Sequence, residues 1–387
     1  MGQQANLAAV LRRHGAAYLA TQPLSVAKAR AWRAILACRT AALGGHVESC
    51  DACGTTRHVY HSCRNRHCPT CQTRAKEAWI AARRRELLPV PYFHLVFTLP
   101  HALHGLVADH PRRLYETLFA AASATLTEFA ATARHLGGES AFTLVLHTWK
   151  QDLARHIHVH ALVAGGALTA SGEWVHPKRG FLFPVKALSK VFRGKFVALL
   201  AEQHTAGKWA CIDDESDWQR LKATLYAHEW VVYAKAPLGG PEQVLEYLGR
   251  YTHRVAISNE RIVGIDQHNV TFRVRADASI NRKRTVSLAG AEFIRRFLLH
   301  VLPSGFKRIR HYGLLAPAHK TKRLNQARTA LGAPTPDPAL IESVATFMQR
   351  VAQIDATACP HCANGHFLVC AALTPVRAPR ALSRGPP

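Results

Sequence analysis

Two Cys-x2-Cys pairs near the N-terminus constrain the fold of this 387-residue chain more than any other feature of its sequence. Cys50-x2-Cys53 and Cys68-x2-Cys71 are separated by 14 residues. Each pair can present two thiolates to one tetrahedral Zn²⁺, and two pairs complete the coordination shell. No apolar secretory segment precedes the cysteines, which favours metal ligands over disulfides. We therefore expect one structural zinc bound by Cys50, Cys53, Cys68 and Cys71.

The remaining cysteines divide into alternates and isolated residues. Cys63 and His67 lie in the same loop as alternate zinc ligands, although Cys63 is more simply explained as a buried apolar residue. A further pair, Cys359-x2-Cys362, lies near the C-terminus and suggests a second zinc with weaker spacing. Cys38 and Cys211 are isolated, and we expect them to be structural.

The charge of the chain indicates a polyanionic partner. The formal net charge is +25, and it is concentrated in residues 1–90, with +10, and 250–330, with +13. Arg outnumbers Lys by 36 to 14, and guanidinium groups suit phosphate oxygens and base edges. The alternative is a solvated Arg-rich surface, but DNA is the favoured partner. A hydrophobic fraction of 48% excludes a disordered basic tail protein, and no apolar run reaches the ~18 residues of a membrane span.

The middle of the chain alternates strands with helices, which predicts an α+β fold. We expect strands at 92–99, 142–149, 156–164 and 230–234. We expect helices within 5–42 and at 73–88, 111–136, 185–203, 217–228, 241–253, 289–302 and 338–353. Residues after 331 look like a linker with one helix and a disordered tail.

Three histidines alternate along the expected strand at 156–164. His156, His158 and His160 share one face of that strand, while Ile157 and Val159 point to the other. Imidazoles side by side on a rigid strand can bind one divalent cation, which can polarise a phosphate oxygen. The alternative is a polar strand face exposed to water.

Two tyrosines lie one helical turn apart in the expected helix at 241–253. Tyr247 and Tyr251 share one face of that helix, with Arg250 and Arg254 adjacent. A tyrosine hydroxyl becomes a useful nucleophile beside cations and a metal-bound phosphate. Its attack on a phosphodiester would conserve the bond energy in a phosphotyrosine. The alternative is an aromatic pair in the core.

The order of these motifs resembles a known family. SCRNRHCPTCQ, then HIHVHALV, then EYLGRYTHRVAIS is similar to the HUH-endonuclease transposases of rolling-circle insertion sequences, the insertion sequence 91 family. ACRTAALGGH and FIRRFLLHVLPSGFKRIRHYGLL also look like that family, and the resemblance covers about residues 8 to 330.

The resemblance implies a fold, an activity and a set of site residues. It implies an HUH-type antiparallel sheet with flanking helices and an N-terminal zinc-binding module. His158 and His160 match the metal-binding pair, with His156, Gln151 or Asp152 as the third ligand, and Mg²⁺ or Mn²⁺ as the metal. Ile157 stands where such strands often carry proline, and it leaves the ligand face unchanged. Tyr247 and Tyr251 match the nucleophiles that nick and rejoin single-stranded DNA.

These features divide the chain into four parts. They are a helical segment at 1–45, a zinc-binding module at 46–90, a catalytic domain at 91–330 and a C-terminal region at 331–387 with the weaker cysteine pair. Arg64 and Arg66 beside the zinc and Arg250 and Arg254 beside the tyrosines are expected to contact DNA. The expected protein is a cytoplasmic transposase, nucleoid-associated when bound to DNA. The alternatives are a rolling-circle replication initiator, a relaxase, or a non-catalytic zinc-dependent regulator. The sequence leaves the oligomeric state open.

Overall fold

The computed structural model describes most of the chain. The described residues are 5–178, 182–209, 212, 214–238, 243–244, 249, 256–275, 283–336, 343, 346, 348–350, 353–362 and 364–376. Within these ranges, no helix has both the length and the apolar character needed to cross a membrane.

The largest sheet has five strands in the order β12-β4-β5-β3-β8, and every neighbouring pair is antiparallel. The strands are β3 (Tyr92–Thr98), β4 (Ala141–Trp149), β5 (Arg155–Ala164), β8 (Val232–Leu238) and β12 (Ile309–Gly313). The three strands expected at 92–99, 142–149 and 156–164 are confirmed. The fourth, expected at 230–234, begins two residues later and extends to Leu238. β5 is central in this sheet, so the sheet holds its histidines in a fixed register.

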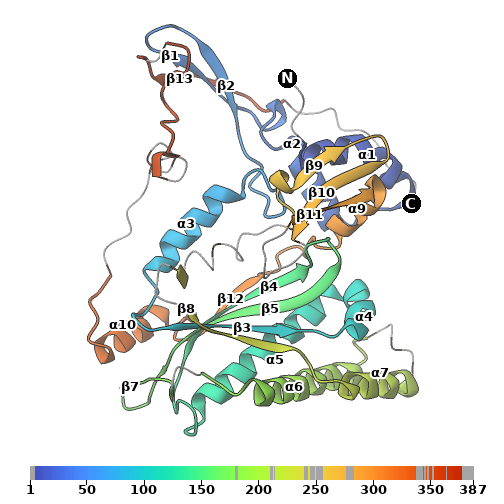
Figure 1. The fold of residues 1–387 in the computed structure, drawn as a ribbon, viewed down its shortest axis with the longest axis vertical. Coiled ribbons are helices and arrows are strands. Elements are labelled where there is room, and N and C mark those ends of the chain that lie inside the picture. Colours follow the sequence, from blue (N-terminus) through green and yellow to red (C-terminus); the bar gives the residue numbers. More distant parts are fainter. Residues whose placement is uncertain are drawn as a thin grey trace.

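Helices cover one face of this sheet (Figure 1). They are α4 (His104–Asp109), α5 (Pro111–Ala131), α6 (Val185–Thr205) and α7 (Glu215–Ala227). Pro111 occupies the first turn of α5, where a missing N–H costs nothing. Ile157 and Val159 of β5 are fully buried in the core on this side, together with Phe119 and Phe192. Each such large side chain contributes about 1.5–3 kcal/mol to stability.

The opposite face of the sheet carries the histidines and a separate apolar cluster. His158, His160 and Leu162 alternate with the core residues of β5, so they point to this side. Leu162 belongs to a buried cluster that includes Tyr92 and Leu324. Trp79 of α3 (Gln72–Arg84) packs against that cluster, and Leu324 comes from α10 (Lys320–Ala330).

A second unit joins the N-terminal helices to residues far along the chain. It contains α1 (Leu7–Thr21), α2 (Val26–Ala37), β9 (Ile262–Ile265), β10 (Asn269–Arg275), β11 (Lys283–Ala289) and α9 (Gly290–Leu298). The strands form an antiparallel sheet in the order β11-β10-β9. Leu11 of α1, Phe272 of β10 and Phe293 of α9 share one buried core. α1 approaches α9 so closely that a Cβ on Gly290 would collide with the imidazole of His14.

A third unit joins the two ends of the chain. β1 (Gly45–Cys50) pairs with β2 (Thr56–Tyr60) on one side and with β13 (Phe367–Leu373) on the other. Figure 1 shows these three strands together, away from the five-stranded sheet. The C-terminal pair of cysteines is therefore part of the N-terminal module in space. A short hairpin of β6 (Ala167–Leu168) and β7 (Trp174–Val175) completes the described strands.

The expected fold class is confirmed. The chain combines an antiparallel sheet and flanking helices with an N-terminal module rich in cysteine. The helix expected at 111–136 ends at Ala131. Most of the helix expected at 241–253, including Tyr247, Arg250 and Tyr251, lies outside the described residues, as do Arg254, Cys211 and the end of the tail.

Candidate functional site

Three histidines converge on the open face of the five-stranded sheet. They are His147, His158 and His160, and ligand nitrogens of all three lie within 4.8 Å of one another. His147 on β4 is the cross-strand partner of His158 on β5. The Nε2 atoms of His158 and His160 are 3.1 Å apart, close to the roughly 3 Å between adjacent ligands of an octahedral metal ion. The three rings are therefore placed to bind one cation.

Hydrogen bonds fix how two of these rings are turned. His158 Nδ1 donates to the carbonyl of His156 over 3.1 Å, which leaves the Nε2 lone pair for a ligand. His160 Nδ1 shares a 2.8 Å hydrogen bond with Nε2 of His94, on β3. His160 can therefore donate a hydrogen bond from Nδ1 to His94, while the lone pair on its Nε2 stays directed toward His158.

Burial favours the neutral form of two imidazoles at this site. It lowers the pKa of His158 to about 3 and that of His94 to about 4, and Lys235 also lowers the pKa of His94. His147 is only 3% exposed. A neutral imidazole offers the lone pair that a metal needs, so His158 can bind a cation without first losing a proton.

The structure places a different histidine beside the expected pair. His156 lies beside His158, with ring centroids 4.8 Å apart, but it is not among the three converging rings. Asp152 accepts a hydrogen bond from the Ala154 amide, and Gln151 lies at the edge of the same region. His147 takes the place expected for these residues, because the register of β4 with β5 sets it opposite His158. The signal in the sequence was a histidine near the end of the preceding strand.

The histidines open into a cleft with basic walls. The cleft has a volume of about 490 Å³ and is lined by His147, His158, His160, Trp149, Lys150, Gln151, Asp152, Arg261, Val274, Arg275 and Arg284. Four of these residues are cationic and one is acidic. The Arg261 guanidinium lies over the ring of Phe272 and donates from Nε to the carbonyl of Arg273 over 2.8 Å. The cleft is suited to a phosphate chain that passes over the three histidines.

The described residues around the expected nucleophiles lie on the side of the sheet that carries the three histidines. Val244, three residues before Tyr247, is fully buried in the apolar cluster that contains Leu162 of β5. A Cβ on Gly249 would collide with the side chain of Ile80, so this position packs closely against α3. The tyrosines themselves lie outside the described residues.

Among the described residues, cysteines form two groups of four, and the members of each group differ from those expected. The inner cluster is Cys38, Cys63, Cys68 and Cys71, and the outer cluster is Cys50, Cys53, Cys359 and Cys362. The four sulfur atoms of each cluster lie within 4.8 Å of one another. This arrangement corrects three expectations. Cys50 and Cys53 lie apart from Cys68 and Cys71, Cys38 is not isolated, and Cys63 lies among the four sulfurs of the inner cluster instead of being only a buried apolar residue.

His67, Arg66 and Arg64, which lie between cysteines of the inner cluster in the sequence, have different surroundings. His67 is outside the cluster and lines a small cavity with His300 and Arg308, where burial lowers its pKa to about 3. Arg66 donates from Nη1 to the carbonyl of Phe306 over 2.6 Å, so part of its guanidinium is engaged within the fold. Arg64 is exposed and has a φ of 50°. Of the two arginines expected to contact DNA in this module, Arg64 is the more available.

Two family models match the chain. Residues 10–99 match the family described as "Transposase zinc-binding domain", and residues 141–323 match the family described as "Putative transposase". The first match contains all four cysteines of the inner cluster, and the second contains His147, His158 and His160.

Curated relatives match nearly the whole length. The chain is 44% identical over 373 residues to "Putative transposase y4qJ" of Sinorhizobium fredii, covering 94% of each protein. It is 28% identical over 335 residues to the "Transposase for insertion sequence element IS801" of Pseudomonas savastanoi pv. phaseolicola, covering 85% of this chain and 80% of that relative.

Solved structures give a much weaker likeness. A conjugative relaxase TrwC in complex with mutant oriT DNA is 15% identical, with a TM-score of 0.23, over 63% of this chain and 75% of that one. A copper-bound TrwC structure with oriT DNA is 13% identical, with a TM-score of 0.23, over 56% and 89%. Values this low carry no argument about function.

The zinc-binding family match covers the N-terminal part of the cysteine-rich module, and the transposase family match covers the part of the antiparallel sheet that carries the three histidines. The chain is a transposase with a zinc-binding domain. It belongs to the insertion sequence 91 family of transposases.

Proposed function

We propose that this transposase nicks and rejoins single-stranded DNA at the ends of its insertion element, through a 5′-phosphotyrosine intermediate. The observation that carries the proposal is the convergence of His147, His158 and His160 on the floor of a cleft with basic walls. Such a site suits phosphodiester chemistry, because it can neutralise a phosphate and hold it still.

The three histidines fit a divalent metal ion. Their nitrogens converge, burial favours the neutral form of His158, and the site opens toward the cleft where a phosphate would enter. When bound, the ion would withdraw charge from the scissile phosphate. Three imidazoles are a better donor set for Mn²⁺ than for Mg²⁺, which prefers oxygen ligands. We therefore expect Mn²⁺ to support activity at lower concentration than Mg²⁺.

The basic walls would position the strand. Lys150, Arg275 and Arg284 are exposed at the cleft and can contact successive phosphates. Arg261 is held over Phe272 and adds a further cation to the lining of the cleft. Contacts of this kind orient the backbone without reading its sequence.

Tyr247 and Tyr251 are the proposed nucleophiles. A new bond forms between the phenolic oxygen and phosphorus, while the bond from phosphorus to the 3′ oxygen breaks. The phenol loses its proton, and the departing 3′ oxygen gains one to become a hydroxyl. The burial of Val244 beside Leu162 supports the placement, because it anchors the start of this segment on the histidine face of the sheet. Two tyrosines would allow one to hold the first cut end while the other makes a second cut, as rolling-circle transposition requires.

The cysteine-rich module would recognise the element ends. Arg64 is exposed beside a groove that also contains Arg30 and Asn65, between α2 and the inner cluster. Arg250 and Arg254 would hold the cut strand near the tyrosines.

The decisive experiment is a cleavage assay with labelled single-stranded element ends and Mn²⁺. We expect a covalent protein–DNA adduct and a free 3′ hydroxyl. A Tyr247→Phe/Tyr251→Phe variant should lose the adduct but keep binding, and the two single variants identify which tyrosine attacks. Tight binding without any adduct in the wild-type protein would favour a non-catalytic regulator. Cleavage only at a replication or transfer origin would favour an initiator or a relaxase.

A further inference from the structure

The outer cysteine cluster contains residues from both ends of the chain. Cys50 and Cys53 lie at and just after the end of β1, whereas Cys359 and Cys362 precede β13. The family match to a zinc-binding domain ends at residue 99, so it contains only half of this cluster. We propose that these four cysteines bind a second structural Zn²⁺, separate from the zinc of the inner cluster, and that this ion joins the C-terminal strand to the N-terminal module.

The sulfur atoms have the spacing of a tetrahedral zinc site. Sγ of Cys50 is 3.6 Å from Sγ of Cys362, and Sγ of Cys53 is 3.8 Å from Sγ of Cys359. Four sulfurs at about 2.3 Å from a zinc ion lie about 3.8 Å from one another. The inner cluster has the same spacing, with 3.7 Å between Sγ of Cys63 and Sγ of Cys71. Both clusters therefore match a closed site of four thiolates, which leaves no open position for a substrate.

Backbone hydrogen bonds fix the two turns that carry the cysteine pairs of the outer cluster. The Gly54 amide donates to the carbonyl of Cys50 over 3.0 Å, in a turn where Gly54 has a φ of 69°. The Cys359 amide donates to the carbonyl of Gly365 over 2.9 Å, which closes the second turn. A Cβ on Gly365 would collide with Sγ of Cys50, so only glycine lets the two turns approach this closely.

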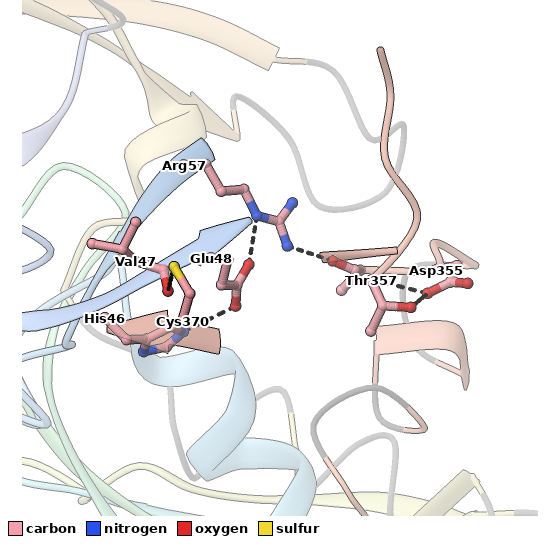
Figure 2. A network of polar contacts seen from close by, with 8 residues as sticks. His46, Val47, Glu48, Arg57, Asp355, Thr357 and Cys370 are labelled. Atoms are coloured by element: carbon pink, nitrogen blue, oxygen red, sulfur yellow. Dashed lines mark hydrogen bonds and ion pairs between the residues drawn. The ribbon is translucent and has the colours of Figure 1, made fainter. Parts of the chain in front are cut away.

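A strand pairing and a polar network support the same junction. β13 pairs with β1 from Gly45 opposite Leu373 to Cys50 opposite Phe367. Figure 2 shows the side chain of Arg57, on β2, between Glu48 and the C-terminal segment that contains Thr357. Arg57 Nε donates to Glu48 over 2.6 Å, and its Nη2 donates to the carbonyl of Ala356 over 2.7 Å.

The same arginine also packs on the C-terminal strand. Its guanidinium carbon lies 3.8 Å from the ring centroid of Phe367, the first residue of β13. Phe367 is buried beside Cys50 and Cys359. The junction thus has an apolar centre formed by Phe367 next to the sulfurs. The zinc would connect Cys50 with Cys362, which are 312 residues apart in the chain. A metal that closes so long a loop restricts the unfolded chain strongly.

The test uses the full-length protein, purified with zinc and alkylated with N-ethylmaleimide before peptide mapping by mass spectrometry. The eight cysteines of the two clusters should be protected. Cys370 is exposed and outside both clusters, so it should react. A Cys359→Ser variant should lose one zinc per chain and expose Cys50, Cys53 and Cys362 to alkylation. The inner cluster should stay protected.

Two further variants complete the design. Cys370→Ser should retain the zinc content of the wild type. Cys359→His should restore the zinc lost in Cys359→Ser, because zinc also accepts a shell of three thiolates and one imidazole. Unchanged zinc and unchanged protection of Cys50 and Cys53 in Cys359→Ser would overturn the proposal. So would exposure of Cys68 and Cys71 together with them in a variant that remains folded, since that pattern means the two N-terminal pairs share one ion. If Cys359→Ser unfolds altogether, the result for Cys359→His decides. These readouts do not depend on DNA cleavage.

Discussion

His147 and His158 face each other across β4 and β5, with ring centroids 5.5 Å apart and the ring planes inclined at 70°. This pairing places a histidine of the neighbouring strand beside His158, where the alternation of β5 alone suggests His156. It therefore defines which histidines the chemistry should need.

His147→Ala should reduce the rate of adduct formation at least about 100-fold, because one of three metal ligands is lost. His156→Ala is the matched control. It should stay within a few fold of the wild type, since it is the backbone carbonyl of His156 that hydrogen-bonds to His158. The measurement is single-turnover cleavage at a fixed Mn²⁺ concentration. Equal losses in the two variants would contradict the assignment of His147.

His94 should act as a positioning residue for His160. His94→Ala should weaken Mn²⁺ binding about 10- to 100-fold, because the hydrogen bond that orients His160 disappears. Raising the Mn²⁺ concentration should restore most of the cleavage rate. His94→Asn, which keeps an acceptor, should lie between the wild type and His94→Ala. A rate that stays low at saturating Mn²⁺ would indicate a different role.

Binding of single-stranded DNA should depend strongly on salt. Each neutralised phosphate contributes about −0.7 to the slope of log affinity against log salt. An Arg275→Ala/Arg284→Ala variant should therefore lower the magnitude of this slope by about 1.4 if each residue contacts one phosphate. Arg220→Ala is the control, because Arg220 pairs with Asp217 on α7, on the helical side of the sheet. An unchanged slope in the double variant would place the strand elsewhere.

The fold should lose stability as the pH falls from about 6.5 toward 4. Burial lowers the pKa of His300 to about 4, so its neutral form is favoured in the folded protein. The unfolded chain takes up this proton below the ordinary value of 6.5, and the contribution is complete only above that pH. Between these two pH values, protonation linked to His300 should lower the free energy of unfolding by about 1.4 kcal/mol per pH unit.

Denaturant unfolding at several pH values measures this effect. His67 lies beside His300 in the same cavity and adds to it with the same sign, because burial lowers its pKa to about 3. His300→Gln should remove the contribution of one proton from the slope of the free energy of unfolding against pH. A slope that does not change in this variant would mean that His300 is protonated in the folded state.

The sequence by itself determined the features that depend on short spacing. The alternation in HIHVH places His158 and His160 on one face, because successive residues of a strand point to opposite sides. Apolar and β-branched runs define β3, β4 and β5, since a strand buried on one face needs them. A Cys-x2-Cys pair identifies two ligands of one metal, because a single turn brings both sulfurs together.

Only the tertiary structure decided which distant pieces meet. Cys53 and Cys68 are separated by 14 residues, whereas Cys359 is 306 positions beyond Cys53, and a short loop costs less entropy to close. The pairing of β13 with β1 outweighs that preference and brings Cys359 to Cys53. In the same way, the register of β4 against β5 selects His147 over His156. These choices follow from strand pairing and burial summed over the whole fold, which no local pattern contains.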